Sequence, residues 1–282
     1  MRSVSVSAVL TIVVMLWSGI AQAVDNATLY APYQQLLNKF LVERDLPDNG
    51  LVSAFDYDAA VNHDGAQALI ANQRQALTDL DLSSLESRQE SVAFWINAYN
   101  FFMLKQILTD RPQGRLVSSV WDYGGRINPF VDSVFEKQKF VIGGHKFSLS
   151  EIEKEILLGE DYTEKGWKDA RVHFAVNCAS VGCPPLRKMV YTADNLEQLL
   201  AENTRRALGT QRHLEVEGNT LRVTELFKWY AKDFEQASGS RKDFIKSWVD
   251  SALAARISAT SELAYIDYDW DLNRPDNFPE LQ

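Results

Sequence analysis

Residues Ala93 to Leu104 place the strongest constraint on the fold, because nearly every side chain in this stretch is apolar. The sequence there reads AFWINAYNFFML. A helix of this composition is apolar on every side, and such a helix is stable only where other elements surround it. We therefore predict a central helix, with the rest of the chain packed around it.

Asn97 and Asn100 are the only clearly polar residues of this stretch. They are three residues apart, so both amides lie on one face of the predicted helix. A buried amide that lacks hydrogen-bond partners costs about 1–3 kcal/mol. Two interpretations follow. The amides bind loop backbone and fix the packing of neighbouring segments, or they point into a site, where Asn97 orients a catalytic group and Asn100 binds a ligand.

Helical patterns outnumber strand patterns along the chain, and the strands are predicted as hairpins rather than as βαβ units. One hairpin spans Lys139–Leu149 around Gly143-Gly144, and a second spans Leu214–Val223. Two adjacent glycines supply the positive φ angles that a two-residue hairpin turn needs. These patterns favour the α+β class: a single, mostly helical domain with a small, mainly antiparallel sheet built from hairpins.

Shorter patterns predict the remaining elements. Apolar spacing predicts helices over 29–43, 66–80, 194–208, 224–234 and 243–255, and two overlapping capping boxes, Ser148 with Glu151 and Ser150 with Glu153, begin another helix. Alternation predicts strands at Phe55–Tyr57, Arg115–Trp121 and Tyr265–Trp270. Residues 171–177 fit either a strand or a short helix, because four of these seven residues are apolar.

The N-terminus has the three parts of a secretory signal peptide: Arg2, a mostly apolar run from Val4 to Ile20, and Ala21-Gln22-Ala23. We expect residues 1–23 to be removed and the protein to be exported, either periplasmic or secreted. An N-terminal membrane anchor is the alternative, although the run is short for a bilayer span. Residues 24–84 are expected to form a helical segment that packs on the core, and 274–282 a polar tail.

Removal of residues 1–23 takes away one basic residue, Arg2, and no acidic one, so the net charge changes from −9 to −10. An acidic surface repels nucleic-acid phosphates, whose neutralisation supplies most of the affinity of DNA-binding proteins. Nucleic acid is therefore a poor candidate partner, and we expect an unidentified small-molecule or peptide ligand. We expect no stable membrane insertion after cleavage, and no motif indicates a cofactor.

Residues 171–186, RVHFAVNCASVGCPPL, contain both cysteines of the chain and one of its four histidines. Thiol and imidazole together are typical of nucleophilic, redox or metal chemistry. In a first hypothesis Cys178 is the nucleophile, His173 is its base, and Asn97 or an acid such as Asp269 or Asp271 orients the imidazole ring. The reaction would be acyl transfer, or hydrolysis of an amide or thioester.

Three alternatives remain open for these side chains. Cys178 and Cys183 could cycle between dithiol and disulfide, although their C-x4-C spacing differs from the C-x-x-C of thioredoxin-like proteins. They could bind a soft metal together with His173, but no fourth ligand is visible. They could form a structural disulfide in a binding or scaffolding module, where so small a ring contributes about 2 kcal/mol. Asn177, Ser180 and Cys183 are then candidate binding residues.

Several motifs, taken in order, resemble the family called domain of unknown function 547. They are Phe94-Trp-Ile-Asn-Ala-Tyr-Asn100, Gly143-Gly-His-Lys-Phe-Ser-Leu-Ser-Glu-Ile-Glu153, His173-Phe-Ala-Val-Asn-Cys178, Cys183-Pro-Pro-Leu186, Phe227-Lys-Trp-Tyr-Ala-Lys-Asp-Phe234 and Tyr268-Asp-Trp-Asp-Leu-Asn273. The resemblance predicts a core domain over residues 85–273. It implies little chemistry, although the occurrence of this family beside glutaredoxin domains in some eukaryotic proteins favours thiol chemistry.

Overall fold

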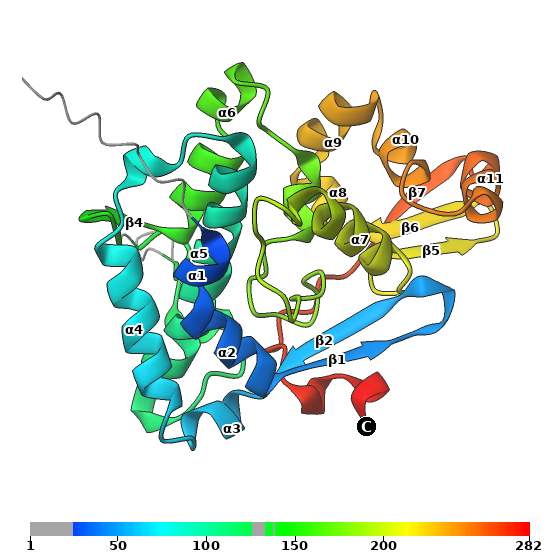
Figure 1. Ribbon diagram of the computed structural model, residues 1–282. Helices are drawn as coiled ribbons and strands as arrows, with labels where there is room; N and C mark the ends of the chain where they lie inside the picture. The colour runs from blue at the N-terminus through cyan, green and yellow to red at the C-terminus, as the bar shows by residue number, and fades with distance from the viewer. Residues whose placement is uncertain (1–24, 126–132, 138) are drawn as a thin grey trace, which may run out of the picture.

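A computed structural model describes residues 25–125, 133–137 and 139–282 (Figure 1). The predicted signal peptide, 1–23, lies outside the described residues. The described helices are α1 (Asn26–Leu29), α2 (Ala31–Phe40), α3 (Tyr57–Val61), α4 (Ala66–Thr78), α5 (Arg88–Thr109), α6 (Glu160–Glu164), α7 (Leu196–Leu208), α8 (Leu226–Trp229), α9 (Ala231–Ser238), α10 (Arg241–Lys246) and α11 (Ser251–Ala259). The described strands are β1 (Leu41–Asp45), β2 (Leu51–Phe55), β3 (Phe140–Ile142), β4 (His145–Phe147), β5 (Leu214–Glu217), β6 (Thr220–Thr224) and β7 (Glu262–Ile266).

Helix α5 is the predicted central helix, and 17 of its 22 residues are buried. It begins with a capping box, in which Ser87 accepts the Glu90 N–H and the Glu90 carboxylate accepts the Ser87 N–H. Helices α2 and α4 pack with α5 in one apolar cluster. The Tyr30 hydroxyl also donates a hydrogen bond to the carbonyl of Phe94, which ties the N-terminal segment to the central helix. The prediction of an enclosed helix is confirmed.

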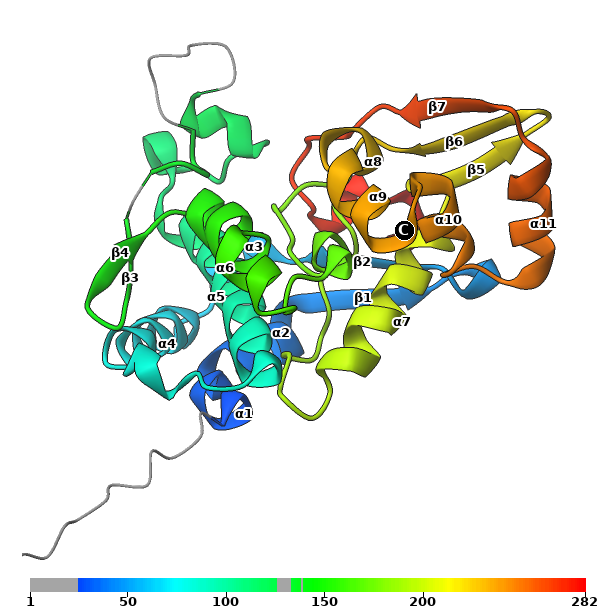
Figure 2. The same ribbon diagram turned by 90° about the horizontal axis from the view of Figure 1, so that it is seen from above.

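The described residues bury two main apolar clusters. The first cluster surrounds α5, and the second lies between the β5–β6–β7 sheet and the C-terminal helices, with Phe227, Phe234 and Phe244 at its centre. Figures 1 and 2 show the corresponding division, with α1–α6 on one side and α8–α11 with their sheet on the other. Val172 belongs to the first cluster and Phe174 to the second, so the intervening His173 lies at the junction.

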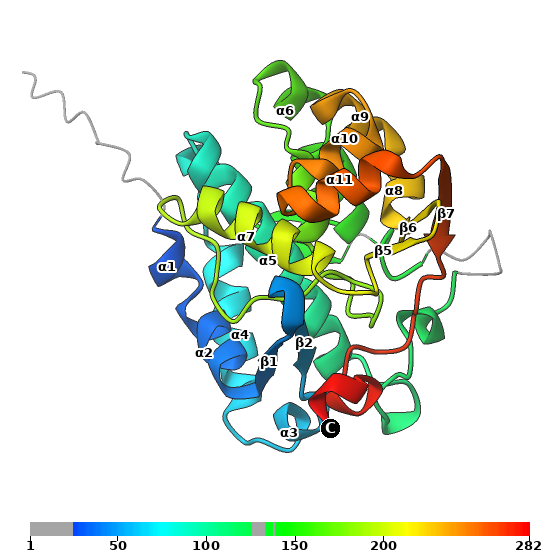
Figure 3. The same ribbon diagram turned by 90° about the vertical axis from the view of Figure 1, so that its right-hand side faces the viewer.

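Three small sheets confirm the α+β class. β1 with β2, β3 with β4, and β5 with β6 are antiparallel pairs, and the predicted hairpins at Gly143-Gly144 and 214–223 are present. β7 instead pairs with β6 in parallel, because α8–α11 form the crossover that a parallel connection requires (Figure 3). This closing strand is Glu262–Ile266, earlier than the predicted Tyr265–Trp270.

Strand pairing and polar side chains end or replace several predicted elements. The helix predicted over 29–43 ends at Phe40, because the following residues pair with β2. Asp56 accepts the Ala59 N–H and starts α3 where a strand was expected. The strand predicted over Arg115–Trp121 is wrong: Ser119 starts the 3-10 turn η4 (Val120–Tyr123) and makes only an isolated bridge with Asp271.

The C-terminal helices are also more broken than predicted. The pattern over 224–234 gives α8 and α9, separated at Tyr230, and the pattern over 243–255 gives parts of α10 and α11. Residues predicted as a polar tail form two 3-10 turns and bury Phe278 against β2. Within the described residues, no helix combines the length and the apolar character that crossing a bilayer requires.

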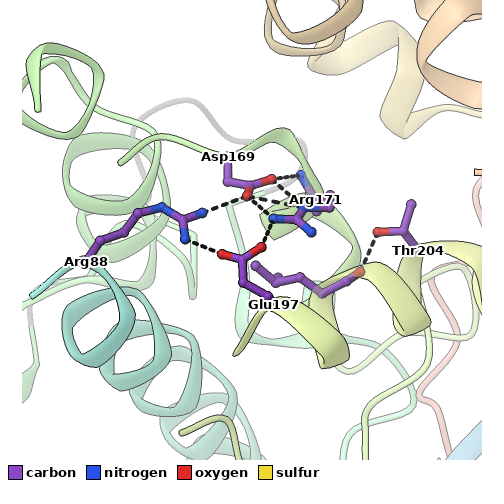
Figure 4. Close-up of polar contacts among 6 residues, drawn as sticks. Arg88, Asp169, Arg171, Glu197 and Thr204 are labelled. Carbon is purple, nitrogen blue, oxygen red and sulfur yellow. Dashed lines mark hydrogen bonds and ion pairs between the residues drawn. The ribbon is translucent and has the colours of Figure 1, made fainter. Parts of the chain in front are cut away.

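The 3-10 turn η6 (Ala170–Phe174) is held by a network of arginines and carboxylates (Figure 4). Asp169 accepts the backbone N–H of Arg171 and also pairs with its guanidinium, with N···O distances of 2.6–3.2 Å. Arg88 at the start of α5 pairs with Asp169, and Glu197 on α7 pairs with both arginines. The network therefore joins α5, η6 and α7, and it fixes the turn that carries His173.

The pKa of Asp169 predicts how acid acts on this network. Burial alone would raise it, but the hydrogen bonds and charge of Arg171, with the charge of Arg88, hold it below its ordinary value. A carboxylate with a lowered folded-state pKa stabilises the fold at neutral pH and loses that contribution as the pH falls. We expect Asp169→Asn to lower the free energy of unfolding by about 2 kcal/mol at pH 7, and by clearly less at about pH 3.

Urea denaturation of both proteins at the two pH values measures this difference. Asp161→Asn is the matched control, because Asp161 pairs only with the exposed Lys165 within its own helical turn, and such pairs contribute little. An equal loss for Asp169→Asn at both pH values would show that the charge of Asp169 does not stabilise η6.

Candidate functional site

A cavity of about 290 Å³ opens between the two apolar clusters, and we call it the aromatic cavity. Cys178, Cys183 and His173, three of the candidate residues that the sequence indicated, all line it. Glu153 also lines it. Its remaining walls are largely aromatic: Tyr99, Trp121, Phe135, Trp229, Tyr230, Tyr268 and Trp270. Residues far apart in the chain are therefore brought together around both cysteines.

Cys178 and Cys183 are joined by a disulfide, with their Cα atoms 6.3 Å apart. Asn177 shapes the loop between them. Its side-chain oxygen accepts the Ala179 N–H at 2.9 Å, and its amide nitrogen donates to the Pro184 carbonyl at 2.8 Å. Ala179 has φ of 62°, a left-handed conformation that costs a non-glycine residue about 1–2 kcal/mol. The loop is thus held in a fixed, locally strained shape beside the reactive atoms.

The segment 268–273 supports this loop from the other side. Gly182 donates its N–H to the Asp269 carbonyl at 2.8 Å, and a Cβ atom at residue 182 would approach the Asp269 backbone to 3.0 Å. Only a glycine permits so close a contact without a shift. The Asp269 carboxylate itself is exposed and accepts the Asp271 N–H, so the structure does not bring it to His173. Asp269 supports the loop through its backbone.

The amides of Asn97 and Asn100 bind backbone on either side of the cysteine loop. Asn100 accepts the Asn177 N–H at 2.8 Å and donates to the Ala175 carbonyl at 2.9 Å. Asn97 makes the equivalent pair of bonds to the N–H and carbonyl of Tyr191, at 2.9 and 2.7 Å. Neither amide lines the cavity. These contacts match the packing interpretation, in which α5 fixes the segments that present the site.

His173 has an orientation suited to proton transfer. Its side chain is fully buried, and its ring stacks on Tyr230 with 3.9 Å between centroids. Nε2 lies 2.9 Å from Oδ2 of Asp233, which favours the tautomer with the proton on Nε2. Nδ1 has no hydrogen-bond partner among the described residues. Its lone pair therefore has no donor among the described residues.

Asp233 is the site residue that the sequence analysis did not select. Burial alone would raise its pKa, but hydrogen bonds and charge from His173 and Lys168 hold the pKa below its ordinary value. Its second oxygen pairs with Lys168 at 2.7 Å, so each carboxylate oxygen has one partner. One sequence signal could have found it: Tyr230 and Asp233 are three residues apart, and both contact the imidazole of His173.

Hydroxyl and amide donors surround the two sulfur atoms. The Ser180 hydroxyl lies 2.9 Å and the Tyr268 hydroxyl 3.1 Å from Sγ of Cys178. Tyr268 is also 3.1 Å from Sγ of Cys183, toward which the Cys178 N–H points. Burial raises the pKa of Tyr268, so its hydroxyl stays protonated and can donate. Such donors stabilise a thiolate or an oxyanion.

Glu153 reaches the cavity from the π-helical turn η5 (Glu151–Leu157). The predicted capping box of Ser148 and Glu151 is present, with bonds of 2.6 and 3.0 Å. Ser150 makes no such cap, and the carboxylate of Glu153 instead accepts the Tyr230 hydroxyl at 2.7 Å. The wider turn of a π-helix changes the direction of its side chains, and such turns are frequent at functional sites.

The metal hypothesis finds no support in the described geometry. Among residues 25–125, 133–137 and 139–282, no three His, Cys, Asp or Glu side chains are close enough together to hold a metal ion. Both thiols are occupied by the disulfide.

Asn100→Ala tests whether α5 holds the cysteine loop. The substitution leaves the Asn177 N–H and the Ala175 carbonyl without partners, so we expect a loss of about 1–3 kcal/mol in the free energy of unfolding. Faster disulfide reduction by dithiothreitol should accompany it. Asn62→Ala is the control, since Asn62 is exposed and bonds only within its own turn. If the free energy of unfolding and the reduction rate are unchanged, α5 does not hold the cysteine loop.

A free-thiol count tests the disulfide itself. Protein purified without reductant should contain no thiol that reacts with Ellman's reagent, either native or in guanidinium chloride. After reduction it should contain two reactive thiols. A thiol in the unreduced, unfolded sample would contradict the bond between Cys178 and Cys183.

Part of the chain matches a known protein family. Residues 82–207 match a family described as "Protein of unknown function, DUF547". The matched segment holds α5, Glu153, His173 and the cysteine loop, and it ends before Asp233 and Tyr268, so the resemblance suggested for residues 208–273 is not tested by it. No curated protein and no solved structure matches the chain. Residues 82–207, which include the cysteine loop and its histidine, thus form a domain of the DUF547 family of proteins of unknown function.

Proposed function

We propose that this protein is a thiol-dependent enzyme that cleaves an amide or thioester by acyl transfer, with Cys178 as nucleophile and His173 as base. The observation that carries the proposal is the state of His173. Asp233 binds Nε2, Nδ1 is buried without a partner among the described residues, and the ring lines the same cavity as Cys178. A thiol, a base and a carboxylate that orients the base are the parts of a nucleophilic triad.

The disulfide must open before Cys178 can react. A dithiol reductant transfers two electrons and two protons to the Cys178–Cys183 bond and becomes a disulfide itself. This exchange proceeds through a mixed disulfide. The bond seen in the structure is then the resting, inactive form of the enzyme, and the reduced form is the active one.

The reduced site supports a two-step reaction. Nδ1 of His173 takes the proton of the Cys178 thiol, and Sγ bonds to the substrate carbonyl carbon. The tetrahedral intermediate breaks its bond to the amine or thiol leaving group, which receives the proton from His173. A water molecule then gives a proton to Nδ1 and attacks the thioester carbon. The carbon–sulfur bond breaks, a carboxylic acid is released, and His173 returns the proton to the Cys178 thiolate.

Tyr268 and the backbone N–H of Cys178 are the candidate donors to the carbonyl oxygen. In the disulfide form both point at Sγ of Cys183. Reduction separates the two sulfur atoms and makes these donors available for an oxyanion, where one donor typically contributes 10²–10³-fold in rate, about 3 kcal/mol. Ser180 is a further donor to the Cys178 sulfur.

The enzyme is exported in this proposal, because residues 1–23 have the composition of a signal peptide. The resting disulfide fits an oxidising compartment such as the periplasm or the cell exterior. Activity there would depend on a local thiol reductant, and the ligand is a small molecule or peptide that fits the aromatic cavity.

A binding module is the second candidate function. It is favoured by the disulfide, which occupies the nucleophile, and by the aromatic cavity, which suits a ligand. In that case Cys178 and Cys183 only stabilise the loop, and His173 only fills the junction between the apolar clusters.

Alkylation distinguishes the two candidates. Cys183→Ser removes the disulfide and leaves Cys178 as the single thiol of the chain. We expect its alkylation by iodoacetamide at pH 7 to be faster than that of glutathione. Adding His173→Gln or Asp233→Asn should slow it about 10-fold or more, because a neighbouring base and its carboxylate promote the thiolate. Rates are measured by mass spectrometry, with circular dichroism to confirm folding.

p-Nitrophenyl acetate adds a test of acyl transfer. We expect Cys183→Ser to release one equivalent of p-nitrophenolate in a burst and to carry an acetyl group on Cys178, while Cys178→Ala gives no burst. Alkylation no faster than that of glutathione and unaffected by His173→Gln would reject the enzyme and support the binding module.

A further inference from the structure

Glu153 is a buried carboxylate that no cation of the described chain neutralises. Its side chain belongs to a residue only 7% exposed, and its contacts are hydroxyls: Tyr230 at 2.7 Å, and Tyr99 as a second hydrogen-bond donor. The ion pairs among the described residues do not include it. A buried charge is costly unless an opposite charge balances it. The cavity therefore holds one carboxylate whose negative charge a cationic ligand would balance.

The other acidic and lysine side chains that line the cavity are Glu136 and Lys154, and Lys154 is an exposed residue. The Ser133 backbone and side chain donate to the carboxylate of Glu136 at 3.0 and 2.9 Å. These bonds, with a smaller effect from the nearby charge of Lys154, hold the pKa of Glu136 below its ordinary value. Glu153 is thus the carboxylate left for a ligand.

The cavity walls suit a cation as well. Trp229 contacts Tyr268 and Trp270 at centroid distances of 4.9 and 5.8 Å, and Trp121 contacts Trp270 at 4.9 Å. Trp229 is 42% exposed, although large apolar side chains are usually covered. The negative face of an aromatic ring attracts a cation, and tryptophan does so most strongly. The walls and Glu153 therefore favour the same ligand charge.

We infer that the aromatic cavity binds a primary ammonium group of the substrate, and that Glu153 is the residue that selects it. This inference rests on the proposed function and names its substrate class: an acyl compound or peptide with an amine close to the bond that is cleaved. Tyr230 links the two groups that would act on such a substrate, because its hydroxyl bonds Glu153 while its ring stacks on His173. The carboxylate for the ammonium group and the base for the reacting carbonyl thus contact the same tyrosine.

The test measures binding in the disulfide form, so it does not depend on catalysis. The probes are n-butylammonium, n-butanol and n-butyrate, titrated against intrinsic tryptophan fluorescence and checked by calorimetry. We expect butylammonium to bind about 10-fold more tightly than butanol, as a charge pair combined with cation–π contacts allows, and butyrate to bind most weakly.

Glu153→Gln should bring the affinities for butylammonium and butanol within about 3-fold of each other. The amide still accepts hydrogen bonds from the tyrosine hydroxyls, but it carries no charge. Glu136→Gln is the matched control in the same cavity and should keep the preference. Trp229→Ala, at an exposed position, should weaken butylammonium binding several-fold without affecting folding. Equal affinities for butylammonium and butanol in the unaltered protein, or a preference that survives Glu153→Gln, would overturn the inference.

Catalysis separates this inference from the proposed function. In the Cys183→Ser protein, thioesters with an amine in the acyl group should be cleaved faster than their neutral isosteres, and Glu153→Gln should remove that difference. Acyl transfer without an amine preference would reject the role of Glu153 alone. Ammonium binding without acyl transfer would reject the thiol enzyme alone.

Discussion

The structure depends on the burial of α5, which carries two amide side chains away from solvent. Because each amide must find partners inside the protein, Asn97 and Asn100 bind the backbone at Tyr191 and at residues 175–177. These bonds fix the chain on both sides of the cysteine loop. The buried helix α5 is therefore also the element that positions the segment with both cysteines.

The site forms where the two apolar clusters meet. Val172 packs in one cluster and Phe174 in the other, which holds the intervening His173 at the boundary. The C-terminal part then supplies Asp233 for the imidazole and Tyr268 for the sulfur atoms. The proposed site thus needs both parts of the chain, although the family match covers only residues 82–207.

Local patterns predicted the elements whose signal lies within one short stretch of sequence. The apolar run at 93–104, the Gly143-Gly144 hairpin and the Ser148–Glu151 capping box all carry their own signal, and the structure contains each of them. The predictions that failed lie where distant contacts override the pattern. Ser119 starts a turn and pairs singly with Asp271, and the helix predicted over 224–234 breaks at Tyr230, which contacts His173 and Glu153.

The sequence by itself determined where the candidate site residues lie, because both cysteines and His173 fall within residues 171–186. It could not name the partner of His173: Asp269 and Asp233 are both acids far from His173 in the sequence, and spacing does not say which one folds against the ring. Only the tertiary structure decided this, by placing α9 over η6 and leaving Asp269 exposed. It likewise turned Glu153 from an expected helix cap into a cavity carboxylate, because a π-helical turn changes the direction of its side chains.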